Sequence, residues 1–290
     1  MSWLALALIA VSAVLHAGWN YIAKRASDSV SFLWGVCGAV PVISVLVSLG
    51  AWLFFDIPLD LSAWRLALLG GFFQALYVGF ISAGYNEGDL SIVYPLARGL
   101  APLIIAVLAW VALHEVPTVV GIIGMVLVLI GAIALATDLQ GNDDAEKSSA
   151  AASVRLALAA AAMIAAYHVI DKAGAQNSNV VSYLLMMQIV LFVFLTPFIF
   201  LRSRAAEAVS AVRGNLINVF VAAVFLYAAY ALVVAAMMFE DVAYIAAARN
   251  ISILFGIIFG VVGLKEGRPT IRIIAGLLIT AGIVTLATGG

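Results

Sequence analysis

Two arginines of this chain lie inside long apolar segments. Arg98 lies in the segment from 90 to 113, and Arg249 lies in the segment from 242 to 263. An arginine in the hydrocarbon core costs about 3 kcal/mol on insertion scales, so its presence there indicates a function. The planar guanidinium binds carboxylate or phosphate groups through two parallel hydrogen bonds. The pair therefore predicts a site for a small anionic or zwitterionic molecule.

The position of each arginine along its segment strengthens this prediction. Each lies about seven or eight residues into a helix that rises 1.5 Å per residue, which places it a few ångströms from the bilayer midplane. The alternative is a structural role, in which each arginine binds carbonyls of a broken helix or pairs with Asp89 or Glu240. The sequence leaves both interpretations open.

Other polar and aromatic residues at membrane depth extend the predicted site, because polar side chains in a span usually face the bundle interior. Gln74 and Tyr77 share one helix face, since they are three residues apart, and so do Tyr227 and Tyr230. Besides the two arginines, the predicted substrate-binding residues are Trp19, Asn20, Gln74, Tyr77, Tyr94, His168, Tyr227, Tyr230 and Asn250. Further polar residues at membrane depth are Tyr85, Tyr167, Gln188 and Tyr244. Tyrosines near helix ends also suit an interfacial belt, and mid-helix amides also suit contacts between helices.

Titratable groups inside the spans are few. His16 and His168 are the predicted proton-coupling residues, because histidine changes its charge near physiological pH. The sequence predicts no carboxylate deep in a helix. Asp171 is followed by Lys172 near the end of a span, and we expect these two residues to form a pair at the surface.

The composition excludes several classes of protein. The chain is 66% hydrophobic and 10% charged, where an average soluble domain is about 25% charged. A net charge of −1 argues against a nucleic-acid partner, which requires a basic face. One cysteine and three scattered histidines predict neither a disulfide framework, nor a metal site, nor a cofactor. We also find no nucleophile with a base and no pair of acids in one segment, so we do not expect an enzyme.

Ten segments are apolar and long enough, at about 20 residues each, to cross a bilayer. The first resembles a signal peptide but lacks the positively charged start that such a peptide needs, so we expect a transmembrane helix there. The ten predicted spans are 3–22, 32–55, 66–85, 90–113, 118–137, 154–172, 180–201, 216–239, 242–263 and 269–288.

The basic residues orient these spans. Only Arg65 and Lys172 lie at the ends that the even-numbered spans reach. The positive-inside rule therefore places both termini outside and the polar segment 138–153 in the cytoplasm. The ten basic residues on the predicted cytoplasmic side are Lys24, Arg25, Lys147, Arg155, Arg202, Arg204, Arg213, Lys265, Arg268 and Arg272.

The chain also reads as two copies of one five-helix unit. Gly88 to Thr118 can be aligned with Glu240 to Thr270 with a single-residue gap. An odd number of helices per copy gives the copies opposite orientations in the membrane, an arrangement typical of secondary transporters. We therefore predict an all-α membrane protein with ten transmembrane helices in two inverted repeats, 1–137 and 154–290, joined by a cytoplasmic linker over 138–153. The residues that this alignment pairs are Asp89 with Asp241, Arg98 with Arg249, and Glu115 with Glu266, and the Gly131–Ala136 pattern recurs at Gly282–Ala287.

This pattern resembles the drug/metabolite transporter superfamily, and within it the ten-helix EamA-type carriers. The resemblance rests on the helix count, the repeat, and a fourth helix that ends in His114-Glu115, echoed by Lys265-Glu266. It implies a bundle in which helices 1–4 and 6–9 surround a central cavity while helices 5 and 10 are peripheral. Small relatives that export organic cations use a glutamate in helix 1, which this chain lacks.

We therefore predict a secondary transporter that exports a small amino-acid-like metabolite by alternating access. The expected setting is a bacterial inner membrane, and the expected partners are the substrate and the lipid bilayer, with the protein a monomer or a homodimer. A sugar-phosphate exchanger and a flippase for phosphate-containing lipid headgroups remain alternatives, because two arginines also suit a phosphate. A channel is disfavoured, since the sequence shows neither rings of like charge nor a filter.

Overall fold

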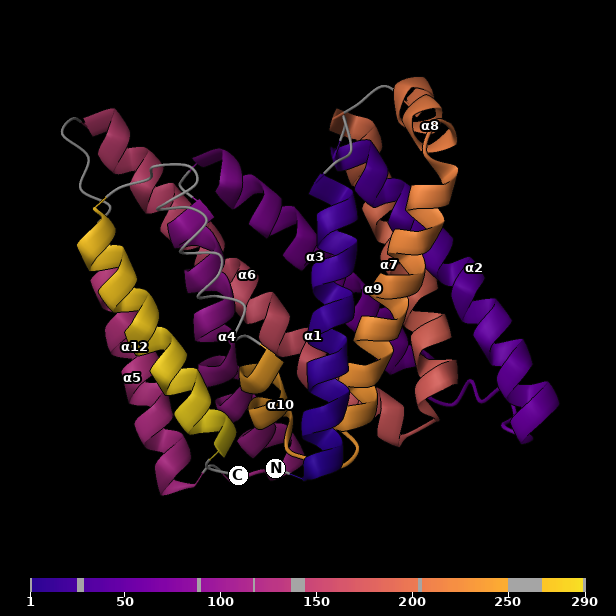
Figure 1. The fold of residues 1–290 in the computed structure, drawn as a ribbon, viewed down its shortest axis with the longest axis horizontal. Coiled ribbons are helices and arrows are strands. Elements are labelled where there is room, and N and C mark those ends of the chain that lie inside the picture. The colour runs from indigo at the N-terminus through magenta and orange to yellow at the C-terminus, as the bar shows by residue number, and fades with distance from the viewer. Residues whose placement is uncertain are drawn as a thin grey trace. The chain divides into compact units, whose positions relative to one another are not determined.

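The computed structural model describes residues 2–24, 29–87, 90–116, 118–136, 144–202, 205–249 and 268–288. Within these ranges all regular secondary structure is helical (Figure 1). The helices are α1 (Trp3–Lys24), α2 (Ser29–Phe55), α3 (Trp64–Glu87), α4 (Leu90–Leu113), α5 (Val119–Ala136), α6 (Asp144–Gln176), α7 (Val180–Arg202), α8 (Ala205–Arg213), α9 (Leu216–Ala236), α10 (Val242–Arg249) and α12 (Pro269–Thr288).

The helices agree with the predicted spans within a few residues at most ends. Six of them, α2, α3, α4, α6, α7 and α9, contain stretches long and apolar enough to cross a membrane. Shorter apolar stretches lie in α1, α5 and α12. The chain is therefore a multi-pass α-helical membrane protein. Of the predicted ninth span, only α10 falls within the described residues.

Two helical segments differ from the predicted boundaries. Helix α6 begins at Asp144 rather than at residue 154. Its first ten residues are polar but rich in alanine, with Glu146 and Lys147, so they favour a helix although they are too polar for a membrane span. The short helix α8 lies in the predicted loop after α7.

Helix α12 begins at Pro269, as predicted, where a missing backbone N–H is harmless. Arg272 in its first turn was expected in a loop, but it is buried.

The helices pack as two compact units, each formed from two stretches of the chain. The α1–α2 unit comprises residues 2–75 and 170–239, and the α4–α5 unit comprises residues 76–169 and 240–290. Helices α3 and α6 contribute residues to both units.

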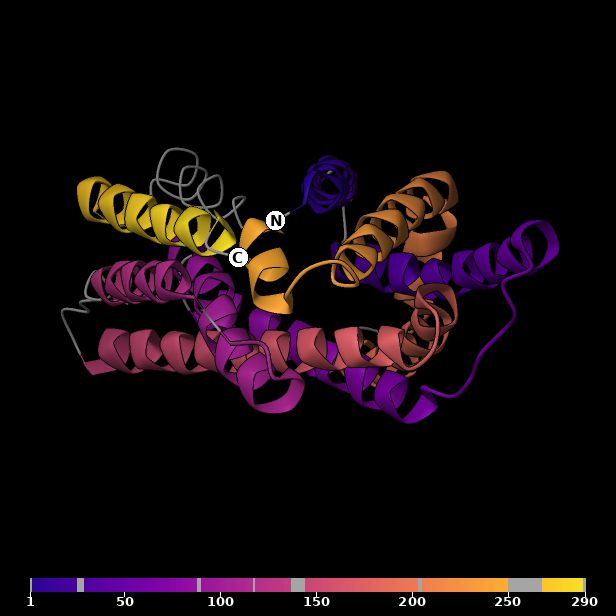
Figure 2. The same ribbon diagram turned by 90° about the horizontal axis from the view of Figure 1, so that it is seen from below.

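In the α1–α2 unit, helix α1 packs along α9, and α2 packs against α7 and α9 (Figures 1 and 2). The Ser12 hydroxyl donates a hydrogen bond of 2.7 Å to the Ala229 carbonyl, which joins α1 to α9. The Trp34 indole donates a hydrogen bond of 3.2 Å to the Thr196 hydroxyl, which joins α2 to α7. Hydrogen bonds between helices, made by side chains, are expected where helices pack in lipid without water.

In the α4–α5 unit, helix α12 packs along α5, and α10 packs against α4 and α12 (Figure 2). The α5–α12 pair is close because glycines lie at the crossing. A Cβ atom at Gly131 would lie 2.8 Å from the Ala275 carbonyl oxygen, and one at Gly282 would lie 2.6 Å from the Gly124 carbonyl oxygen. Small residues allow this approach, which gives dispersion contacts along both helices.

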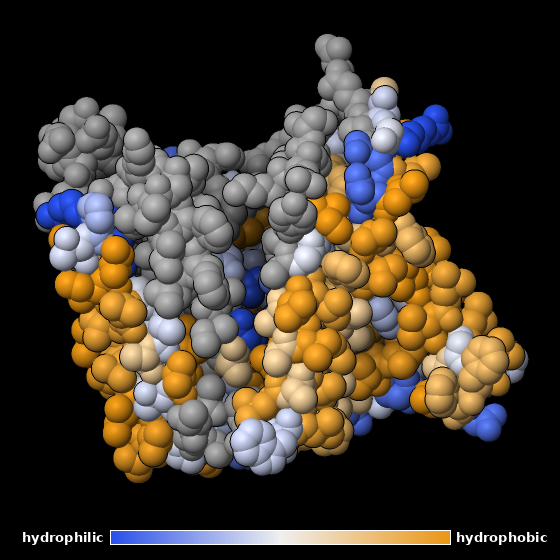
Figure 3. All heavy atoms as spheres, viewed as in Figure 1, coloured by the Kyte–Doolittle hydropathy of each residue, from blue (hydrophilic) through white to orange (hydrophobic). Residues whose placement is uncertain are grey.

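The outer surface is apolar over much of both units (Figure 3). Large hydrophobic side chains are exposed along α2, α5 and α12, among them Leu53, Phe54, Ile133 and Leu277. A soluble monomer rarely exposes apolar patches of this extent. The exposed apolar faces are therefore the ones that contact lipid.

Candidate anion-binding site

Helix α4 carries Arg98 inside the α4–α5 unit, where three tyrosines surround its guanidinium. Tyr94 lies one turn earlier on the same helix, and the guanidinium carbon lies 5.6 Å from the centre of the Tyr94 ring. The Arg98 side chain is hydrogen-bonded to the Tyr77 hydroxyl from α3, and Tyr167 from α6 also lies near it. The Arg98 Nε atom is buried. A phenol is neutral at physiological pH, so these tyrosines hold the cation without cancelling its charge.

Helix α6 adds two stacked rings to the same site. The Tyr167 ring lies 4.5 Å from the His168 ring and 6.0 Å from the Tyr77 ring, measured between centroids. His168 Nδ1 lies 2.8 Å from the Ile164 carbonyl oxygen. Because a carbonyl can only accept, Nδ1 carries the proton of the neutral ring, and Nε2 is its acceptor atom.

Helix α10 brings Arg249 to this site. Arg249 is the last residue of α10, and its Nε and Nη1 atoms are buried. The charges of Arg249 and Arg98 both act on the His168 ring. The structure therefore places five predicted site residues in one unit, namely Tyr77, Tyr94, Arg98, His168 and Arg249.

The start of α10 is fixed by an acidic residue that follows α4. His114 has a left-handed backbone with φ of 61°, which turns the chain sharply after α4. The next residue, Glu115, then accepts a hydrogen bond of 3.0 Å from the Val242 backbone N–H through its Oε2 atom. A carboxylate at a helix N-terminus satisfies a free N–H group and favours the helix dipole.

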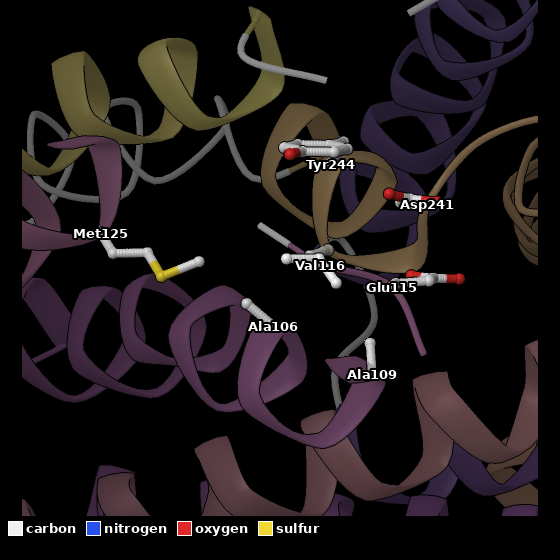
Figure 4. A pocket seen from close by; sticks show the side chains of 8 residues that line it. Ala106, Ala109, Glu115, Val116, Met125, Asp241 and Tyr244 are labelled. Carbon is white, nitrogen blue, oxygen red and sulfur yellow. The ribbon is translucent and has the colours of Figure 1, made fainter. Parts of the chain in front are cut away.

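A small pocket adjoins this contact (Figure 4). Its lining includes Glu115, Asp241, Tyr244 and Met125, and it has space for no more than about one water molecule. Tyr244 is buried here, and its hydroxyl accepts a 3.4 Å hydrogen bond from the Thr118 N–H, so it does not belong to an interfacial belt. The pocket is lined by none of the arginine-site residues, and we regard it as packing around the α10 start.

The other predicted site residues that the structure describes lie in the α1–α2 unit. The Trp19 indole donates a 3.0 Å hydrogen bond to His16 Nδ1, so the Nε2 atom carries the proton of the neutral His16 ring. Tyr227 is buried and hydrogen-bonded with Ser44. The Gln74 Oε1 atom is buried with no hydrogen-bond donor among the described residues.

Three further candidates fall outside what the structure describes. Asn250 lies outside the described residues, and Asn20 and Tyr85 lie in helices whose side chains at these positions are not described. Gln188 is buried within α7.

The prediction for Asp171 and Lys172 was wrong. Asp171 has no exposed surface and Lys172 is only 7% exposed, so neither lies at the surface. Asp171 accepts hydrogen bonds from Tyr230, a predicted binding residue, and from Tyr183, which the sequence did not single out. The sequence contained a pattern that could have predicted the burial of Asp171. Asp171 lies four residues after Tyr167 and therefore shares its helix face.

Comparison with known proteins gives one family match and one structural match. None of the curated proteins compared is similar in sequence to this chain. A solved structure, described only as "Crystal structure of protein", has the same fold with a TM-score of 0.61 at 14% identity, covering 98% of this chain and 96% of that one. The model of the EamA-like transporter family matches residues 3–137. Residues 3–137 are therefore similar to the EamA-like transporter family, which lies within the drug/metabolite transporter superfamily, as the sequence pattern predicted.

Proposed function

We propose that this protein is a secondary transporter that exports a small anionic or zwitterionic metabolite of the amino-acid type by alternating access. The observation that carries the proposal is the Arg98 guanidinium, hydrogen-bonded to Tyr77 and lying over Tyr94 within membrane-spanning helices. The family of residues 3–137 supports transport as the activity.

The chemistry of the site suits a zwitterion. A substrate carboxylate would bind the Arg98 guanidinium through two parallel hydrogen bonds. A substrate ammonium group would bind the faces of Tyr77 and Tyr167, which lie 6.0 Å apart, or the Nε2 acceptor of His168. Arg249 would supply a second positive charge, and a doubly charged phosphate would use both arginines.

The packing of equivalent helices supports the two predicted repeats. The helices that correspond in the repeats 1–137 and 154–290 pack in pairs within the units, as α2 with α7, α4 with α10, and α5 with α12. The family model ends at residue 137, where the first repeat is predicted to end. Two similar halves of opposite orientation suit alternating access, in which they move against each other around a central site.

We infer from the basic residues that the protein crosses a bacterial inner membrane with both termini outside. Ser62 follows α2 on the predicted outer side, and Ser210 in α8 lies on the predicted cytoplasmic side. A membrane-impermeant maleimide should label Ser62→Cys in intact cells, and Ser210→Cys only after permeabilisation. The unaltered chain is the control, because its Cys37 is buried. The opposite labelling pattern would reverse the proposed orientation.

The substrate class is tested by ligand-induced stabilisation of the detergent-purified protein. Amino acids, organic acids, sugar phosphates and nucleotide sugars would be compared on the wild type, Arg98→Gln and Arg249→Gln. Loss of a charged hydrogen bond is worth about 1.5–3 kcal/mol, so affinity should fall at least tenfold in Arg98→Gln. Arg155→Gln is the matched control, because Arg155 is an exposed arginine of α6.

Each outcome separates the possible functions. Stabilisation by amino acids that is lost in Arg98→Gln supports the proposed function. Stabilisation by sugar phosphates that requires both arginines indicates an exchanger of organophosphates. Saturable uptake of the stabilising compound into liposomes argues against a lipid flippase. Anion binding that is unchanged in both variants would make the arginines structural.

A further inference from the structure

A buried carboxylate lies in the α1–α2 unit, apart from the arginine residues. Asp171 has no exposed surface, although it lies in the apolar span Ser149–Gln176 of α6. It lies five residues before the end of that helix, about 8 Å along its axis. An ionisable side chain inside a membrane span is costly, and such residues mark ion and proton pathways.

Three other helices meet at this carboxylate. The Tyr183 hydroxyl from α7 donates a hydrogen bond of 2.6 Å to Asp171 Oδ1, and the Tyr230 hydroxyl from α9 donates one to Oδ2. Gly70 from α3 packs directly on the pair. A Cβ atom at Gly70 would lie 2.9 Å from Asp171 Oδ1 and 2.5 Å from the Tyr183 hydroxyl. The carboxylate therefore joins α3, α6, α7 and α9.

The groups that face Asp171 determine its chemistry. Both carboxylate oxygens accept from phenols, and these hydrogen bonds stabilise the charged form. Helix α3 contributes a glycine at this point, with no charge. On α6 itself the adjacent residue Lys172 is a buried basic group. A carboxylate in this setting can take up a proton in exchange for one of its tyrosine hydrogen bonds.

We propose that Asp171 is a proton-binding site through which the transporter couples proton movement to transport. When Asp171 is protonated, its O–H becomes a donor, and Tyr183 or Tyr230 must rotate its hydroxyl to accept. The bonds from α6 to α7 and α9 therefore change with the protonation state. This inference rests on the proposed function for its role in transport, whereas proton binding itself can be measured without a substrate.

Asp171 lies close in sequence to two residues of the arginine site. Tyr167 and His168, which contact that site, lie three and four residues before Asp171 on the same helix. The predicted proton-coupling residues His16 and His168 have Nδ1 hydrogen-bonded to the Trp19 indole and to the Ile164 carbonyl, and Asp171 adds a third candidate group.

The direct test is infrared difference spectroscopy of the purified full-length protein, reconstituted in lipid, between high and low pH. A protonated carboxyl has a C=O stretching band that a carboxylate lacks. Comparison of the wild type with Asp171→Asn should show one such band that is absent in the variant. Asp56→Asn is the matched control, because Asp56 lies in an exposed loop and asparagine tolerates its left-handed backbone. This control should leave the band unchanged.

Two further variants keep the carboxylate and remove one donor each. Tyr183→Phe and Tyr230→Phe should both move the midpoint of the band to higher pH, since the charged form loses a hydrogen bond. These variants also provide the test if Asp171→Asn fails to fold. The proposal is overturned if no band assigned to Asp171 titrates between about pH 4 and pH 9, the range of perturbed carboxyls. It is equally overturned if neither tyrosine variant moves the midpoint.

A second experiment separates this proposal from the proposed function. Proteoliposomes that enclose a pH-sensitive dye would receive glutamate or glucose 6-phosphate as probes. The wild type should change the internal pH together with probe uptake, and Asp171→Asn should take up the probe without a pH change. Uptake with no pH change in the wild type would reject proton coupling and leave the transporter function intact. An Asp171 band without uptake of any probe would reject the proposed function and keep the proton site.

Discussion

Gly131 on α5 and Gly282 on α12 occupy reciprocal positions at one helix crossing (Figure 1). Gly131 faces Ala275 and Ile279 of α12, whereas Gly282 faces Gly124 and Val128 of α5. The two glycines are 151 residues apart, as are Arg98 and Arg249. The contacts of Gly131 are therefore repeated around Gly282, as expected if a local two-fold axis relates the two helices.

Because the two glycines pack in the same way, we expect alanine substitutions at Gly131 and Gly282 to destabilise the protein by similar amounts. Gly131→Ala and Gly282→Ala should each destabilise the protein by about 1–3 kcal/mol, because the new methyl group overlaps backbone atoms of the partner helix. Thermal unfolding in detergent would measure the effect. Gly50→Ala in α2 is the control, since a Cβ atom there meets no atom within 4 Å. An unaffected melting temperature in either glycine variant would contradict the close crossing.

Tyr77 should matter for the arginine site through its hydroxyl. Tyr77→Phe removes the hydrogen bond to Arg98, a bond to a charged group worth about 1.5–3 kcal/mol. We expect a ten-fold or greater loss of affinity for the stabilising anion, measured by calorimetric titration. Tyr94→Phe keeps the ring under the guanidinium and should lose less. A larger loss in Tyr94→Phe would show that the Tyr94 hydroxyl is the more important group.

Glu115 should stabilise the start of α10. Glu115→Ala leaves the Val242 N–H without this acceptor, and the loss of a helix cap costs about 1 kcal/mol. Glu115→Gln retains an acceptor oxygen and should retain most of the stability. The melting temperatures of both variants would be compared at constant pH. If the two variants have the same melting temperature, the side chain does not act through this hydrogen bond.

Asp60, in the loop between α2 and α3, should make the stability of the folded protein depend on pH. The backbone N–H of Ser62 donates to the Asp60 carboxylate at 2.9 Å and holds the pKa of Asp60 below its ordinary value, with help from the hydroxyls of Ser62 and Ser178. A lowered pKa in the folded state means that the stabilisation is present above the unfolded pKa of about 3.9 and is lost as the pH falls through the folded value. Asp60→Asn should therefore lower the melting temperature at pH 7, and less so at about pH 3. A penalty that is the same at both values would show that the charge has no part in it.

The sequence by itself determined where most of the helices lie. Apolar length predicts a membrane span, so the helices from α1 to α12 lie within a few residues of the predicted spans at most ends. The exceptions are the start of α6 at Asp144 and the short helix α8, which apolar length does not predict. Hydropathy detects lipid-facing residues, whereas a polar, alanine-rich segment forms helix for reasons of backbone propensity.

The tertiary structure alone decided which side chains meet. Tyr77, Tyr167 and Arg98 come from three helices, and their proximity depends on how each helix is rotated about its own axis. Asp171 and Tyr230 are separated by 59 residues, and no local pattern predicts their hydrogen bond. Burial is set by packing between helices rather than by residue type. For this reason a carboxylate that the sequence placed at the surface lies at the meeting point of four helices.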